Sequence, residues 1–128
     1  MKIAIATAGK TLDSLVDARF GRCPYFLIID SNSKEFKAIE NTAGQSFQGA
    51  GVSAAQMIVN KGVKAVIAGN FGPNAVHVLK NSNIKIFKGI SGIMAKKALR
   101  EYEEGKLKET ITSSTKDFKR PKKGEGRK

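Results

Sequence analysis

The chain has 128 residues, of which 41% are hydrophobic and 27% charged, and its formal net charge is +12. This length supports a single domain, no apolar run approaches the roughly 18 residues of a membrane span, and the N-terminus lacks the pattern of a secretory signal. We therefore expect a soluble, cytoplasmic protein without membrane contacts, and its single cysteine excludes an intramolecular disulfide.

The first half of the chain predicts three strands and one long loop. Residues 2–7, KIAIAT, place two isoleucines on one face and small alanines on the other, which is typical of a buried strand. Residues 8–24 are too long for an ordinary connection, so we expect a functional loop with a short helical turn around LDSLV. The runs YFLIID (25–30) and EFKAIEN (35–41) flank turn-forming residues and predict a hairpin.

The second half alternates helices and strands. From residue 51 the spacing of apolar residues is that of a helix. Gly62 and Gly105 are expected to end helices, and Pro73 is expected to begin one. Ser91 is the expected N-cap of the last helix. The expected elements are a helix in GVSAAQMIVNKG, a strand in VKAVIAG, a helix in PNAVHVLKN, a strand in IKIFKG and a helix in SGIMAKKALREYEEG.

This order predicts an α/β fold in which a three-strand meander and two strand–helix units form one five-stranded mixed sheet with three helices. If only the second strand runs against the others, one sheet edge collects the 8–24 loop, the glycine-rich loops and the N-termini of all three helices. Such an edge favours anions and ligands. GAGVSA (49–54) matches the dinucleotide-binding fingerprint G-x-G-x-x-A. It follows a loose loop instead of the first strand, so we do not favour a dinucleotide site there.

The basic C-terminus differs in character from the rest of the chain. Residues 106–128 contain nine Lys/Arg and three Asp/Glu and have almost no apolar pattern. We predict one domain over residues 1–107 and a disordered basic tail over 108–128. A tail of this kind also favours an alternative function, non-specific nucleic-acid binding through phosphate contacts.

Several segments together resemble the dinitrogenase iron-molybdenum cofactor biosynthesis family, which includes NifX-type carriers and the C-terminal part of NifB-type proteins. The resemblance covers residues 2–107 and lies in LDSLVDARFGRCPYFLIID, Asn41, GAGVSAAQMIVNKGV, VIAGNFGPNAVHVL and IKIF. It implies a ribonuclease H-like fold and a non-catalytic carrier of an iron–sulfur or iron-molybdenum-type cluster, such as a nitrogenase cofactor precursor. Its implied partners are proteins that donate or accept the cluster.

Soft metal clusters prefer thiolate or imidazole ligands, and the chain offers Cys23 and His77. With so few ligands, the site must be open, shared across a homodimer, or suited to a preformed cluster. Arg22 and a loop position would make Cys23 an accessible thiolate; the alternative is a small buried residue beside Pro24. His77 is expected on the exposed side of its helix, where a surface histidine usually has no ligand role.

The remaining candidate site residues are cationic or glycine-rich. Arg19 and Arg22 would neutralise an anionic cluster or a phosphate, unless they are only solvated turn residues. The other candidates at this rim offer backbone N–H groups, and the alternative is that they only shape turns and caps; they are Gly49, Gly51, Asn70 and Gly72.

An enzymatic role is not expected. Two-metal nuclease chemistry needs clustered carboxylates, yet only Asp13 and Asp17 are expected near the rim, and Asp30 should lie at the opposite edge. Nucleophilic catalysis by Cys23 would need a base such as His77 within hydrogen-bonding reach, which the sequence does not establish.

Overall fold

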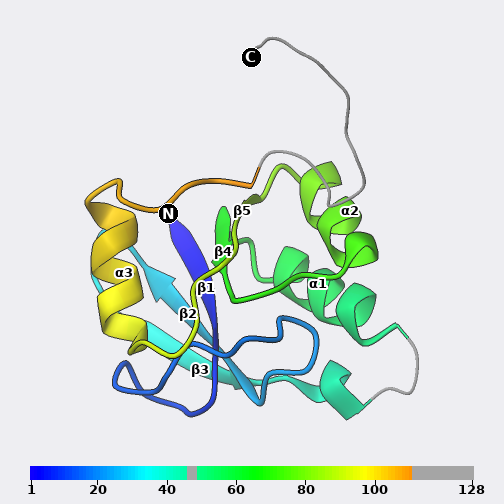
Figure 1. Cartoon of the computed structure of the whole chain (residues 1–128), viewed down its shortest axis with the longest axis horizontal. Helices are drawn as coiled ribbons and strands as arrows, with labels where there is room; N and C mark the ends of the chain where they lie inside the picture. The colour runs from blue at the N-terminus through cyan, green and yellow to red at the C-terminus, as the bar shows by residue number, and fades with distance from the viewer. Residues whose placement is uncertain (46–48, 111–128) are drawn as a thin grey trace, which may run out of the picture.

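A computed structural model describes residues 1–45 and 49–110. Five strands form one sheet in the order β3-β2-β1-β4-β5 (Figure 1). Their bounds are β1 Lys2–Thr7, β2 Tyr25–Asp30, β3 Phe36–Glu40, β4 Ala65–Ile67 and β5 Lys85–Phe87.

The sheet is mixed, as predicted. β2 pairs antiparallel with both β1 and β3, whereas β4 pairs parallel with β1 and β5 pairs parallel with β4. Only β2 therefore runs against the others, and the ends of β1, β4 and β5 meet at one edge together with the start of β2. The α/β fold with a five-stranded mixed sheet is confirmed, and the ribonuclease H-like assignment stays a prediction.

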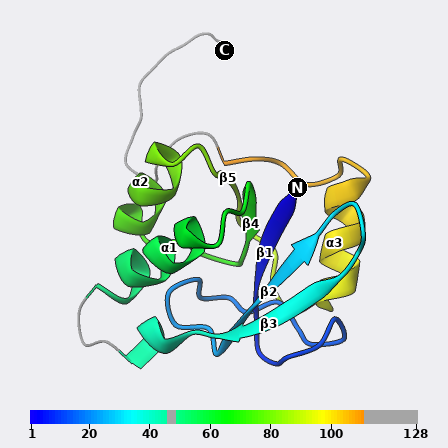
Figure 2. The same ribbon diagram turned by 180° about the vertical axis from the view of Figure 1, so that it is seen from behind.

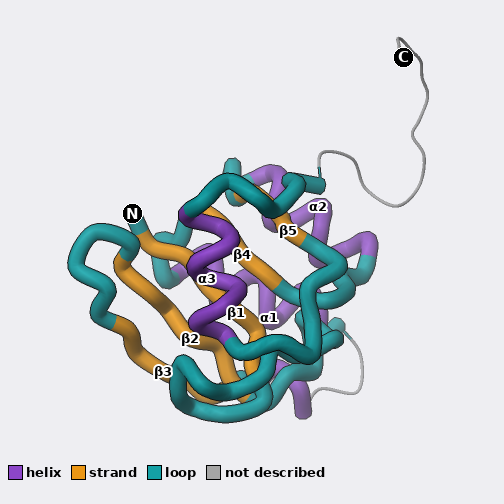
Figure 3. Tube along the Cα trace, turned by 60° about the vertical axis from the view of Figure 1, so that its left-hand side comes forward, coloured by secondary structure: helices purple, strands orange, loops and turns teal. Residues whose placement is uncertain are grey.

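Helices cover both faces of the sheet. A short 3-10 helix, η1 (Thr42–Gln45), precedes α1 (Ala50–Asn60), and α2 (Pro73–Asn81) and α3 (Ala95–Glu103) follow. Figures 1 and 2 show α1 and α2 on one side of the sheet and α3 on the other, and Figure 3 shows α3 in front of the strands. None of the described helices is long and apolar enough to cross a membrane.

The period-two pattern of β1 explains these layers. Ile3 and Ile5 are buried in the core shared with α3, whereas Ala4 and Ala6 are buried in the core shared with α1 and α2. Successive strand residues point to opposite faces. Large side chains therefore fill the space under the single helix α3, and alanines leave room for the paired helices.

Two of the predicted helix boundaries are confirmed, and the predicted start of the last helix is wrong. Gly62 adopts a positive φ of 74° immediately after Lys61, the C-cap residue of α1, and Pro73 is the first residue of α2. Ser91 does not cap the last helix, because α3 begins at Ala95 and has no side-chain cap. Instead, the N–H groups of Ala95 and Lys96 donate to carbonyls of the β1–β2 loop at 2.8 and 2.9 Å.

Described structure continues beyond the end of α3. The backbone N–H of Thr110 donates to the Ile86 carbonyl at 2.6 Å, and Lys80 Nζ donates to the Thr110 carbonyl at 2.6 Å. Residues 108–110 are therefore attached to the domain along β5, three residues past the boundary predicted at 107. Most of the predicted basic tail, residues 111–128, lies outside the described residues.

Candidate functional site

An open pocket of about 490 Å³ lies at the sheet edge where β1 and β4 end. The β1–β2 loop and the first turns of α1 and α2 enclose it. The residues that line this pocket, called the site pocket below, are Arg19, Phe20, Gly21, Arg22, Gly49, Ala50, Gly51, Val52, Asn70, Phe71, Gly72, Pro73, Asn74 and Ala75. The six candidates of the cationic and glycine-rich rim, which are Arg19, Arg22, Gly49, Gly51, Asn70 and Gly72, all belong to it.

Two short Phe-Gly segments form one wall of the site pocket. Arg19 of the β1–β2 loop pairs in parallel with Asn70 of the β4–α2 loop, and the Phe20 N–H donates to the Asn70 carbonyl at 3.0 Å. The rings of Phe20 and Phe71 stack with centroids 4.9 Å apart. The repeated sequence, RFG and NFG, was the signal that could have identified both phenylalanines as site residues.

Close backbone contacts fix the β1–β2 loop against its neighbours. A Cβ atom placed on Gly69 would lie 2.6 Å from Cα of Ala18, and one placed on Gly21 would lie 2.9 Å from Cα of Gly51. Real Cβ atoms do not approach backbone atoms so closely. Glycine at both positions therefore lets the loop contact the β4–α2 loop on one side and α1 on the other.

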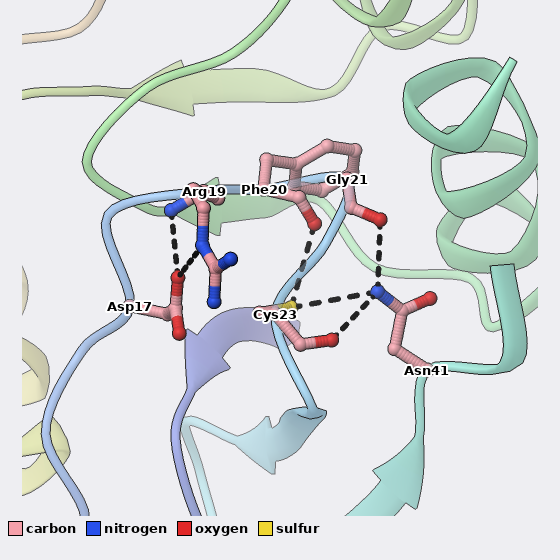
Figure 4. Close-up of polar contacts among 6 residues, drawn as sticks. All are labelled: Asp17, Arg19, Phe20, Gly21, Cys23 and Asn41. Carbon is pink, nitrogen blue, oxygen red and sulfur yellow. Dashed lines mark hydrogen bonds and ion pairs between the residues drawn. The ribbon is translucent and has the colours of Figure 1, made fainter. Parts of the chain in front are cut away.

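The charge of the site pocket is positive. Arg19 and Arg22 are its charged lining residues, and no carboxylate lines it among the residues that the structure describes. Arg19 Nε lies 3.2 Å from Oδ1 of Asp17, which also accepts the Arg19 N–H at 2.8 Å (Figure 4). The hydrogen bond that Arg19 donates to Asp17, together with the negative charge of Asp17, raises the pKa of Arg19. Asp17 thus orients a guanidinium group whose side chain is 63% exposed.

Two helix N-termini add to this positive potential. α1 and α2 begin after Gly49 and Gly72, and neither glycine can cap its helix with a side chain. The first-turn N–H groups of a helix have no partner within the helix, and the helix dipole is positive at this end. The third helix does not contribute: α3 begins at the same sheet edge, beside the β1–β2 loop, but it lies on the other face and its first N–H groups are bonded to that loop.

Cys23 lies in the protein interior. Only 1% of its surface is exposed, its Sγ donates to the Phe20 carbonyl at 3.4 Å, and Asn41 Nδ2 lies 3.8 Å from the sulfur (Figure 4). Burial, and secondarily the charge of Asp17, raise the pKa of the thiol to about 12. The expectation of an accessible thiolate beside Arg22 is therefore wrong, and the geometry favours the alternative of a packed apolar residue.

The raised pKa predicts an unreactive thiol in the native protein. The pKa of an unfolded cysteine is about 8.5, whereas burial raises the pKa of native Cys23 to about 12. The contribution of this proton to stability is therefore complete below the unfolded pKa and is lost as the pH rises toward the folded pKa. We expect a thiol reagent at about pH 8 to modify Cys23 only after denaturant is added.

The effect of the Cys23 proton on the free energy of unfolding can also be measured. Between about pH 9 and about pH 11, the urea midpoint of the wild type should fall more steeply than that of Cys23→Ala, because the variant lacks the titrating thiol. Rapid labelling of the native protein, or parallel pH profiles for the two proteins, would contradict the buried, protonated thiol.

The side chain of Asn41 holds the end of the β1–β2 loop in place. Its side chain is buried, and its Nδ2 donates to the carbonyls of Gly21 and Cys23 at 3.1 and 2.8 Å (Figure 4). These two bonds hold the turn that presents Arg22 to the pocket. Asn41 therefore fixes the shape of this loop.

His77 does not line the site pocket. It is exposed on α2, opposite buried Ala75, Val76 and Leu79, as the helical spacing predicted. Within residues 1–45 and 49–110, no group of three or more His, Cys, Asp and Glu residues is placed to hold a metal ion. The ligand roles of Cys23 and His77 stay predictions that this arrangement does not favour.

The carboxylates expected near the rim have other contacts. Asp13 forms an ion pair with Lys96 at 2.8 Å, and Asp17 binds Arg19. Neither side chain lines the site pocket, so the described residues offer no carboxylate pair there for two-metal chemistry. That the protein has no enzymatic activity stays a prediction.

Comparison with known proteins identifies relatives over most of the chain. The model of the family described as dinitrogenase iron-molybdenum cofactor matches residues 1–105. An uncharacterised protein of Methanocaldococcus jannaschii is 36% identical over 110 residues, which cover 84% of this chain and 89% of that protein.

Two solved structures have the same fold. The apo form of the orange protein from Desulfovibrio gigas is 28% identical with a TM-score of 0.85, over 89% of this chain and 96% of that chain. A Thermotoga protein provisionally described as a NifB protein is 36% identical with a TM-score of 0.75, over 88% of this chain and 97% of that chain.

Proposed function

Because the chain belongs to the dinitrogenase iron-molybdenum cofactor family, we propose that it carries a negatively charged metal–sulfur cluster, bound intact in the site pocket. The observation that carries this proposal is the charge of the pocket: two arginines and two helix N-termini converge on it, and no carboxylate lines it in the described part of the chain.

Electrostatic binding without thiolate ligands suits a carrier. Iron–sulfur and iron-molybdenum-type clusters bear net negative charge, and fixed N–H donors with guanidinium groups bind anions strongly. No ligand bond to Cys23 has to break when the cluster leaves. The openness of the pocket gives the cluster a path to a protein that donates or accepts it, and a nitrogenase cofactor precursor is the cargo that the family description supports.

The aromatic wall gives the pocket a second property. Phe71 is partly exposed and stacks on buried Phe20, so its ring lies beside the cationic groups. Apolar walls lower the local dielectric and strengthen the attraction between the arginines and an anion. A bulky, weakly hydrated anion with sulfide on its surface fits this combination better than a small, strongly hydrated one.

The experiment that tests this function is anaerobic loading with a synthetic iron–sulfur cluster anion. Iron, sulfide and visible absorption should remain with the protein after gel filtration at low salt. Because exposed charges are screened by salt, retention should fall several-fold when NaCl is raised from about 0.05 to about 0.5 M. Absence of retention at low salt, or retention that is unchanged by salt, would contradict electrostatic binding.

Two further expectations from the sequence stay predictions. The alternative function, nucleic-acid binding through the basic tail, depends on residues 111–128, which lie outside the described residues. A homodimer that shares the site stays a prediction as well.

A further inference from the structure

A second concave surface lies on the opposite face of the sheet, beside the start of α3. We call it the α3 groove; it has a volume of about 390 Å³ and is lined by Leu15, Gly92, Ile93, Met94, Lys96, Lys97 and Arg100. Leu15 and Met94 are 50% and 43% exposed, unusually high for such large apolar side chains. Exposed apolar side chains that are grouped in a groove indicate an interaction site.

The backbone fixes the exposure of Leu15. Leu15 and Met94 form an antiparallel bridge, the Val16 N–H donates to the Ile93 carbonyl at 2.7 Å, and the Gly92 N–H donates to the Val16 carbonyl at 3.0 Å. Neighbouring residues of such an extended pair point in opposite directions. Val16 is therefore buried while Leu15 points outward, and Leu15 cannot turn inward without breaking this pairing.

The groove is basic as well as apolar. Lys96 is paired with Asp13, which does not line the groove. Neither Lys97 nor Arg100 takes part in an ion pair with another residue of the described chain. An occupant with carboxylates around an apolar side chain would therefore match both the charges and the apolar floor.

The groove and the site pocket share one loop. Leu15 lines the groove, and Arg19, four residues later, lines the site pocket. Between them, the Asp17 N–H donates to the Ala6 carbonyl at 2.8 Å, and the Asp17 carbonyl accepts the Gly69 N–H at 3.1 Å. Figures 1 and 3 place the start of α3 beside this loop. A protein seated in the groove would therefore contact the β1–β2 loop, which also forms part of the wall of the site pocket.

We propose that the α3 groove docks an acidic protein surface with one projecting apolar side chain, on the protein that gives the cluster to this chain or takes it away. The assignment of that partner rests on the proposed function, whereas the docking chemistry does not. A second copy of this chain fits poorly, because a symmetric contact would bring Lys97 and Arg100 against the same cations. A bilayer fits poorly, because the surface is concave and exposes only two large apolar side chains.

The test uses the full chain, labelled with ¹⁵N, and a short helical peptide that carries one phenylalanine flanked by glutamates. We expect saturable shifts confined to amides around residues 12–16 and 92–100. Lys97→Glu/Arg100→Glu should weaken the peptide about tenfold or more, as should replacing the peptide's phenylalanine with serine. The matched control is Lys61→Glu/Lys64→Glu, which makes the same charge change at exposed lysines outside the groove and should bind about as tightly as the wild type.

Several results would overturn the docking proposal. Shifts spread over the basic surface, equal losses in both double variants, or no loss with the serine peptide would each show unspecific attraction. Tighter, groove-dependent binding of phosphatidylglycerol vesicles or of a single-stranded oligonucleotide would assign the groove to a different class of partner. Cluster loading of Lys97→Glu/Arg100→Glu, measured separately, should equal that of the wild type, so failure of docking and failure of cluster binding are distinguishable.

Discussion

Replacing Arg19 and Arg22 together with glutamine is expected to weaken binding of the cluster anion about tenfold or more, because charge-assisted hydrogen bonds to an anion are the strong ones. Both side chains line the site pocket, and Asp17 orients Arg19 without occupying the pocket itself. Glutamine keeps much of the length of the side chain and the ability to donate a hydrogen bond, so the change removes mainly the charge. Anaerobic titration followed by visible absorption measures the affinity.

The control for this variant is Lys61→Gln/Lys64→Gln. It lowers the net charge of the chain equally, at exposed positions that do not line the pocket. If the affinity depends on the local field of the pocket, this control should bind nearly as well as the wild type. Equal weakening in both variants would mean that the cluster responds only to the overall charge of the protein.

The second large effect is expected from Gly69→Ala. The new Cβ would lie 2.6 Å from Cα of Ala18 and 2.9 Å from its carbonyl oxygen, and these backbone atoms cannot rotate away as a side chain would. Gly69 also donates to Asp17 and accepts from the Gly89 N–H at 2.8 Å, so three loops meet there. We expect the free energy of unfolding to fall by about 1–3 kcal/mol, measured by urea denaturation, together with weaker cluster binding.

Gly72→Ala separates this steric effect from a general loss of glycine. Gly72 has φ −69° and ψ 157°, which alanine adopts without strain, and no neighbouring atom lies within 4 Å of the Cβ position. Its free energy of unfolding should stay within about 0.5 kcal/mol of the wild type. Similar stability of the two alanine variants would show that the Ala18–Gly69 contact does not constrain the loop.

The sheet could be predicted from the sequence because its signals are local. Alternation in KIAIAT, the continuous run YFLIID and the change to helical spacing at residue 51 each occur within one element. The connection rule for strand–helix–strand units then determined that β4 and β5 run parallel to β1. The strand order places the glycine-rich loops at one edge, which is why six predicted rim residues line the site pocket.

The predictions from the sequence were wrong where contacts between distant parts of the chain override a local signal. Ser91 is a good N-cap residue, but α3 begins at Ala95 because the carbonyls of Leu12 and Ser14 satisfy its first N–H groups. Cys23 lies beside Arg22 in sequence, yet its side chain turns inward toward Phe20 and Asn41. The exposure of Leu15 and Met94 also depends on a bridge between loops far apart in the chain, which periodicity does not report.

The most direct test of the account is the affinity of one cluster anion for three proteins under identical low-salt conditions: the wild type, Cys23→Ala and Arg19→Gln/Arg22→Gln. Electrostatic binding in the site pocket predicts that Cys23→Ala binds like the wild type, because the thiol is buried and protonated, while the arginine variant loses most of its affinity. Loss of binding in Cys23→Ala, provided that it remains folded, with retention in the arginine variant would contradict the account and make the cysteine a cluster ligand.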